Sequence, residues 1–303
     1  MSETTQNIIK TITFFDLCSF PLTPLEVWKY LPIKQDFQTT QNNITELVKL
    51  GRLEQQAGFY FLPEHSNLII ERQKRYSGTF LKYRRARRVA KLLAILPWIK
   101  LICLVNQKGP HNLRANGDLD FFIVCQGKRI WLTRWFSVGL LKLFNLRPQP
   151  NNIKNKICLS FLVDTDNLNL QPFLLPLAES NQDWVFIYYL ANFAPLLNRD
   201  NTWTKFLSAN HWLTQILPNN ISNEEWPQLE VTAKACPLFY LFNPLEKLIK
   251  KIQLLILPSQ LKNKMNQGTE VVINDGVLKL HSGDRRQDFN QNFQDKLEQI
   301  LNV

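Results

Sequence analysis

The sequence has no long uninterrupted apolar stretch and no hydrophobic leader. Its longest apolar runs, residues 92–105 and 252–257, are too short, or too broken by Pro97 and Lys100, for the roughly 18 to 20 apolar residues of a membrane span. The first residues lack the basic region and apolar core of a secretion signal. We therefore expect a cytoplasmic protein with no membrane partner.

Cysteine and the common catalytic motifs are also scarce. The five cysteines are odd in number and widely scattered, which argues against a disulfide framework and for reduced thiols. The four histidines are not paired with cysteines or acids at metal-ligand spacing. The chain contains no Gly-x-Ser-x-Gly, no P-loop and no dinucleotide-binding glycine motif, so hydrolases and nucleotide enzymes of those types are not indicated.

What is present is an ordinary globular composition with an uneven charge. The 303 residues are 45% hydrophobic and 20% charged, enough to bury one large or two modest cores. The net charge of +11 divides into −2 for residues 1–70, +14 for 71–150 and −1 for 151–303. A polyanion would therefore bind the middle segment, although a solvated basic helix explains the same charge.

Residues 1–70 show the order helix, helix, helix, hairpin. Thr23-Pro24-Leu25-Glu26 is a capping box with proline at the first helical position, a strong helix start. A third helix begins near Thr40, and the strand-like run 59–62 follows a turn. This order is typical of a winged helix. The outward residues of its third helix include one lysine beside one glutamate, so we favour a packing or protein-contact role over DNA reading.

A long basic helix, residues 71–90, connects this unit to the rest. We expect its arginines to solvate the helix or to track a nucleic-acid backbone, and the sequence does not separate the two roles. The four arginines concerned are Arg84, Arg85, Arg87 and Arg88.

Two acids stand at the start of a predicted strand. The run 99–105 predicts a buried strand, and Asp118-Leu119-Asp120 opens the next one. Strand side chains alternate with period two, so both carboxylates face the same side and could share a divalent cation such as Mg²⁺. A long helix (129–146) and a third strand (157–163) follow.

At these residues the chain resembles the polymerase-beta-like nucleotidyltransferases, and more closely a bacterial family in which a winged helix precedes that domain. The similarity covers nearly the whole chain. The matching segments are Phe15-Asp16, Pro21-Leu22-Thr23, Trp28-Lys29-Tyr30-Leu31, 58–62, 94–98, Asp118-Leu119-Asp120, 129–134, Ala209-Asn210-His211-Trp212 and Thr269-Glu270-Val271-Val272.

The resemblance implies an α+β protein in four parts: a winged helix (1–70), the basic connector (71–90), a small mixed-sheet nucleotidyltransferase-like core (91–170) and a helical C-terminal region (171–303). It also implies catalytic acids that hold Mg²⁺ or Mn²⁺ at Asp118 and Asp120, and an NTP as substrate. In the family a Gly-Ser turn holds the triphosphate. Asn106-Gln107 stands at that place here, with Lys108 and His111 in the same loop, and Gly109 could shift the register of that turn.

The family's third acid is not at its usual place either. On the strand 157–163 the two residues facing like the acids are Cys158 and Ser160, which bind Mg²⁺ weakly. Asp164, at the strand end, is either a late catalytic ligand or a turn residue. Arg134, on the helix after the acids, faces either phosphate or solvent.

The leading interpretation is metal-dependent transfer of a nucleoside monophosphate from an NTP to an acceptor that is a protein, a nucleic acid or a small molecule. Transfer is expected to be weak or lost because the turn and the third carboxylate are altered. The alternatives are an inactive nucleotide- or nucleic-acid-binding protein and, below it, a winged-helix transcription regulator. In residues 171–303 the apolar spacing predicts helices at 184–197, 203–217 and 245–257, each burying its apolar face.

Overall fold

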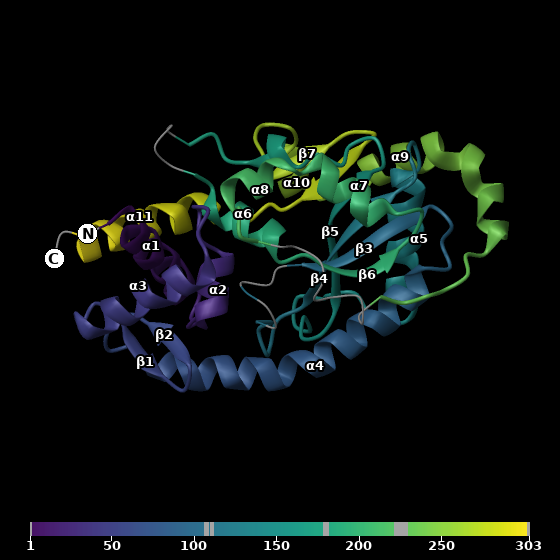
Figure 1. Ribbon diagram of the computed structural model, residues 1–303. Coiled ribbons are helices and arrows are strands. Elements are labelled where there is room, and N and C mark those ends of the chain that lie inside the picture. Colours follow the sequence, from purple (N-terminus) through teal and green to yellow (C-terminus); the bar gives the residue numbers. More distant parts are fainter. Residues whose placement is uncertain (1, 106–108, 110–111, 178–181, 221–229, 302–303) are drawn as a thin grey trace.

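The structure is a computed structural model that describes residues 2–105, 109, 112–177, 182–220 and 230–301. It is an α+β protein with one mixed six-stranded sheet and a separate two-stranded hairpin, as the sequence predicted at this coarse level. Figure 1 shows the sheet at one end of the molecule and the N-terminal helices at the other, with the long helix α4 running between them.

The N-terminal unit has the predicted order of three helices and a hairpin. Its elements are α1 (Glu3–Leu17), α2 (Pro24–Lys29), α3 (Phe37–Lys49), β1 (Glu54–Gln56) and β2 (Phe59–Phe61). The capping box is present: the Thr23 hydroxyl accepts from the Glu26 amide at 3.3 Å, and the Glu26 carboxylate accepts from the Thr23 amide at 2.8 Å. Both orphan amides at the start of α2 are thereby satisfied.

The predicted connector is longer than expected. Helix α4 (Asn67–Leu93) runs for 27 residues. Its C-terminal half contributes apolar side chains to the sheet core, among them Tyr83 and Leu93, so α4 is a structural part of both units.

The sheet has the strand order β6-β3-β4-β5-β8-β7. Its strands are β3 (Ile99–Val105), β4 (Leu119–Cys125), β5 (Ile157–Asp164), β6 (Ala194–Asn198), β7 (Val271–Ile273) and β8 (Val277–Leu280). β4 and β5 are parallel, because α5 (Ile130–Leu143) provides the crossover between them, and the other pairs are antiparallel.

The C-terminal region is not wholly helical, which corrects the prediction for residues 171–303. Three of the six strands, β6, β7 and β8, come from it. The predicted helix 184–197 ends at Ala191, and its last residues form β6 against β3. An apolar run suits a buried helix or a buried strand equally well, and here the free edge of β3 decides in favour of the strand.

Helices cover both faces of the sheet. The first face carries Leu119, Phe121 and Ile123 and packs against α4, α5 and α9 (Glu246–Leu255). The second face carries Phe122, Val124 and Phe161 and packs against α6 (Trp184–Ala191) and α7 (Thr202–Ala209). Among the described residues, the remaining helical elements are α8 (Trp212–Ile216), α10 (Ser259–Lys264), α11 (Arg286–Leu301) and the short 3₁₀ helices Gln171–Phe173 and Pro237–Leu245.

The N-terminal unit and the last helix share a core. Apolar residues of α1, α2 and α3 form one cluster with Trp184, Ile187 and Tyr188 of α6 and Phe293 of α11. Figure 1 shows α1 and α11 side by side. Within the described ranges, no helix combines the length and hydrophobicity that a membrane crossing needs.

Candidate metal centre

The predicted acid pair lies at the beginning of β4. Asp118 directly precedes the strand, and Asp120 is its second residue. Asp120 pairs with Val105 at the end of β3 and with Cys158 near the start of β5. These three strand ends therefore meet at one edge of the sheet, which is where the loop after β3 leaves it.

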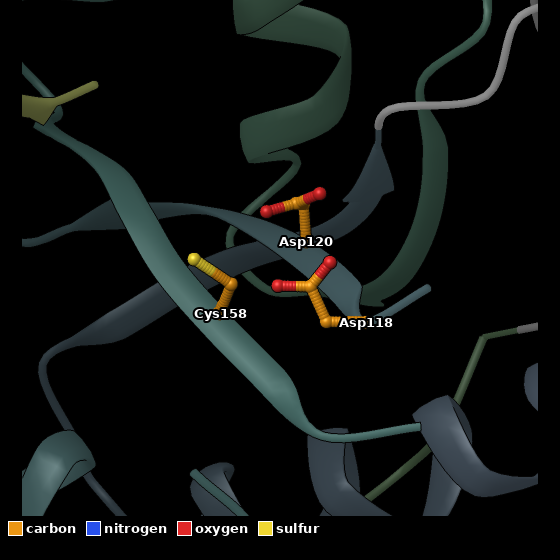
Figure 2. A group of neighbouring side chains, drawn as sticks. All are labelled: Asp118, Asp120 and Cys158. Carbon is orange, nitrogen blue, oxygen red and sulfur yellow. The ribbon is translucent and has the colours of Figure 1, made fainter. Parts of the chain in front are cut away.

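Three side chains converge there. One ligand atom from each of Asp118, Asp120 and Cys158 lies within 4.8 Å of the other two. Figure 2 shows the two carboxylates and the thiol pointing toward a common space between β4 and β5. Asp120 is buried, and the other two are half-buried. The grouping has the size and donor chemistry of a divalent-cation site.

The protonation of Cys158 decides which cation suits this grouping. Burial raises the pKa of the Cys158 thiol well above its usual range, and the charges of Asp120 and Asp118 raise it further. At neutral pH the thiol is thus protonated and adds no negative charge. A hard cation such as Mg²⁺ is held by the two carboxylates alone, whereas a softer cation that displaces the proton gains a sulfur ligand.

A β-bulge shapes the strand that carries Cys158. Asp120 pairs with Cys158, but Phe122 pairs with Phe161, so β5 contains one more residue than β4 over this stretch. Strand alternation places Cys158 and Ser160 on the face of the acids, as the sequence predicted, and the extra residue turns Phe161 to that face as well. Bulges of this kind are frequent beside active sites, where they re-aim a side chain.

A cation from the long helix also reaches the acid pair. Lys82 of α4 is buried, and its ammonium nitrogen donates to the carbonyl of Gly117 at 2.8 Å, directly before Asp118. Burial lowers the pKa of Lys82, Asp118 opposes that change, and the positive charges of Lys154 and Arg85 add to it. Lys82 therefore stands near Asp118, and Lys154 and Arg85 stand near Lys82.

A tyrosine of α6, Tyr189, lies near Asp120. Burial raises the pKa of the Tyr189 hydroxyl on α6, and the nearby negative charge of Asp120 raises it further. The phenol is therefore neutral at physiological pH. No sequence pattern indicates that Lys82 or Tyr189 lies near the acids, because both come from helices far along the chain from β4.

Asp164 does not join the site, although the sequence left a ligand role open for it. It pairs with Cys125 at the opposite end of β4. Its carboxylate accepts from the amide of Asp166 at 3.1 Å and from the side-chain amide of Asn167 at 2.7 Å. These bonds close the turn after β5. Of the two roles left open for Asp164, the structure therefore supports that of a turn residue.

Arg134 does not reach the acids either. It lies on α5, which covers the opposite face of the sheet from Asp120. Its guanidinium donates to the Gln253 side chain of α9 at 2.6 Å. Burial lowers the pKa of Arg134 to about 10, and Arg147 contributes to this change. Arg134 links two helices and does not face the acid pair.

The structure describes only part of the predicted phosphate loop. Asn106, Gln107, Lys108 and His111 lie outside the described residues. Gly109, which is described, has φ +103°, and a Cβ added to it would meet the ring of Phe20 at 2.4 Å. Asn112 accepts from Arg75, and the Leu113 amide donates to the Thr79 hydroxyl. The loop is thus anchored on the N-terminal unit and on α4.

Comparisons of the chain with family models, with curated proteins and with solved structures found no match.

Proposed function

We propose that the chain binds a divalent cation together with an NTP at Asp118 and Asp120, as a relative of the nucleotidyltransferases that it resembles. The observation that carries the proposal is the convergence of the two carboxylates at one sheet edge, with ligand atoms within 4.8 Å. Mg²⁺ sites of this type use one or two carboxylates and complete the coordination with substrate phosphates.

The surrounding residues support an anionic ligand. Lys82 stands beside Asp118. Lys154 and Arg85 are close enough to Lys82 to lower the pKa of its ammonium group. Such cations attract phosphate oxygens and compensate the charge of the two acids. A bound cation would neutralise the phosphates and align them for attack. The role of this chain is to hold that cation through Asp118 and Asp120 and to position the phosphates near α4.

Cys158 limits the chemistry that the site can perform. In the family that the chain resembles, a third acid on the neighbouring strand assists the reaction, and here that strand presents a thiol. A protonated thiol neither adds a third negative charge nor accepts a proton from an acceptor hydroxyl at neutral pH. We therefore propose weak transfer of the nucleoside monophosphate. An inactive nucleotide-binding protein is the second candidate, and it rests on the same residue.

The N-terminal unit fits a winged helix that serves packing. The Tyr30 hydroxyl donates to Asn192 at 2.6 Å, and the Asn219 side chain donates to the carbonyls of Trp28 and Ile33. These bonds fix α2 to the region after α6. The exposed side of α3 carries Glu46 and Lys49, whose charges cancel, so phosphate binding there has little electrostatic support.

Thermal unfolding with Mn²⁺ and a non-hydrolysable NTP tests the proposal. A ligand present at a hundred times its Kd stabilises the folded state by about 2.7 kcal/mol. The wild type should show this stabilisation and Asp120→Asn should lose it. Glu298→Gln, which removes one exposed acid from α11, is the matched control and should behave as the wild type.

Pyrophosphate release from a natural NTP then separates the two candidates. Slow release by the wild type that Asp120→Asn abolishes supports transfer. Binding without release supports the inactive nucleotide-binding protein. Equal thermal shifts in the wild type and Asp120→Asn would contradict both, because the acids would then serve only the fold.

A further inference from the structure

Helix α9 is attached to the protein through a face that carries both polar and apolar side chains. The Glu246 carboxylate accepts from the amides of Trp131 and Leu132 at 2.8 and 3.2 Å, which caps the N-terminus of α5. One turn further, Ile249 is buried, and Gln253 donates to the Trp131 carbonyl at 2.8 Å. Residues 246, 249 and 253 share one helix face, and this face meets the sheet core.

The expectation that helix 245–257 buries its apolar face holds only in part: Ile249, Leu254 and Leu257 pack against the sheet core, but other apolar residues of the segment face solvent. Leu241 and Leu255 are 76% exposed and Leu248 is 52% exposed. A surface helix of a soluble protein normally leaves few large apolar side chains in contact with water. The exposed leucine and isoleucine side chains of the segment, which we call the leucine face, are Leu238, Leu241, Leu245, Leu248, Leu255 and Ile256.

Within each of two consecutive elements, residues of the leucine face lie on one side. In the 3₁₀ helix 237–245, residues three apart are eclipsed, so Leu238 and Leu241 lie on one side. In α9, Leu248 and Leu255 are seven apart and again share a side. Contiguous apolar patches of this kind mark interaction surfaces. Figure 1 shows α9 at the end of the molecule away from α1, α2 and α3.

The charges around the leucine face are positive. Lys247 and Lys251 are exposed on α9, at one residue before and three residues after Leu248. The segment 237–264 contains five lysines, of which Lys250 and Lys264 form ion pairs with Asp275 and Glu270. Its one acid, Glu246, is turned inward to cap α5. Segments that lie in a membrane interface typically combine leucines and aromatic residues with neighbouring lysines. The helices of this segment are too short to cross a membrane.

We propose that this face binds the surface of an anionic lipid bilayer, with the leucines inserted at the headgroup boundary and the lysines on the lipid phosphates. The negative charge of such a surface attracts nearby lysines, and a neutral apolar partner would not supply this attraction. A symmetric contact between two copies would instead bring each copy's lysines against those of the other. The expectation of no membrane partner rests on the absence of a membrane-spanning run in the sequence, and a helix that lies on a membrane surface needs no such run.

Vesicle flotation tests the proposal with the full chain. The probes are vesicles of phosphatidylcholine alone and of phosphatidylcholine mixed with phosphatidylglycerol. The double variant Leu241→Glu, Leu248→Glu changes the leucine face, and Lys247→Glu, Lys251→Glu reverses its charge. The control is Leu50→Glu, Leu81→Glu, which alters two leucines, each 65% exposed, at the end of α3 and on α4.

The wild type and the control should float with the anionic vesicles, and raised salt should weaken the binding. Each of the two face variants should bind at least about tenfold more weakly. No binding of the wild type, or equal binding by the variants and the control, would overturn the proposal. A dimer in sedimentation that Leu241→Glu, Leu248→Glu dissociates, without vesicle binding, would show that a second copy covers this face and would overturn it too.

Discussion

Asp120 of β4 and Cys158 of β5 are register partners in the parallel pair, and both side chains point to the same face of the sheet. The thiol thus occupies the place on the neighbouring strand where a third acid would complete a three-carboxylate site. Its raised pKa keeps it neutral beside two acids. This pairing is the basis of the proposal that the chain holds a cation at the two acids and transfers a nucleotide only weakly.

Restoring a carboxylate at this place should strengthen the site. We expect Cys158→Asp to bind Mg²⁺ about tenfold more tightly than the wild type, since a third oxygen ligand of the right charge joins the pair. Calorimetric titration measures this. Ser160→Asp, two residues along the same face, is the control and should change Mg²⁺ affinity much less. Equal gains in both variants would mean that only the added charge matters.

The close approach of Gly109 to Phe20 should make this glycine sensitive. Gly109→Ala forces a positive φ on alanine and a Cβ into the ring, so we expect a loss of about 1 to 3 kcal/mol in the free energy of unfolding. Gly58→Ala is the matched control: its φ is also positive, but nothing lies within 4 Å of the added Cβ.

Gly58→Ala should lose less stability in urea unfolding than Gly109→Ala. Adding Phe20→Leu should return part of the stability lost by Gly109→Ala, because the smaller side chain gives the Cβ room. Equal losses in the two alanine variants would show that the ring contact contributes nothing.

Lys279 should give stability a pH dependence. Burial lowers the pKa of Lys279 from 10.5 to about 8, and Arg286 adds to this change. Between these two pH values the unfolded chain holds a proton that the folded chain has released. Stability should therefore rise as pH goes from about 8 to 10.5, by about 3 kcal/mol for the whole difference.

The comparison with Lys279→Met isolates this contribution, because the other groups that titrate in this range are common to both proteins. Urea unfolding at several pH values should show the wild type gaining on the variant as pH rises. A difference between the two proteins that stays constant from pH 7 to 10.5 would contradict the assignment.

The four arginines proposed to contact nucleic acid are not equivalent. Arg84 and Arg88 are exposed, one turn apart, whereas Arg85 and Arg87 are half-buried. We expect Arg84→Ala, Arg88→Ala to weaken binding of a labelled oligonucleotide and to reduce its salt slope by about 2, as measured by fluorescence anisotropy. Asn42→Ala, Lys49→Ala on α3 should matter little. The reverse order would favour the transcription-regulator interpretation.

The parts of the fold that the sequence predicted well are those with strong local signals. The capping box at Thr23 fixes the start of α2 from four consecutive residues. The apolar run 99–105 forms β3 with the predicted bounds, and the acid pair has the predicted common face. In each case neighbours in the sequence determine the conformation, so no tertiary contact has to be known.

The parts that the sequence missed depend on distant partners. β6 is a strand because β3 offers it an edge, and nothing within residues 194–198 indicates that edge. Lys82 and Tyr189 reach the acids from helices whose local pattern shows only a basic face and an apolar run. The outward leucines of α9 follow from the bonds of Glu246 and Gln253 to α5, which join residues more than a hundred positions apart.

Electron paramagnetic resonance of Mn²⁺ tests the central claim most directly, because the signal of the free ion is lost when the ion binds. The wild type should remove free Mn²⁺ from solution, and an added non-hydrolysable NTP should tighten that binding. The double variant Asp118→Asn, Asp120→Asn, with its fold checked by circular dichroism, should leave the ion free. Equal Mn²⁺ binding by the wild type and this variant would contradict the assignment of the two acids as the cation site.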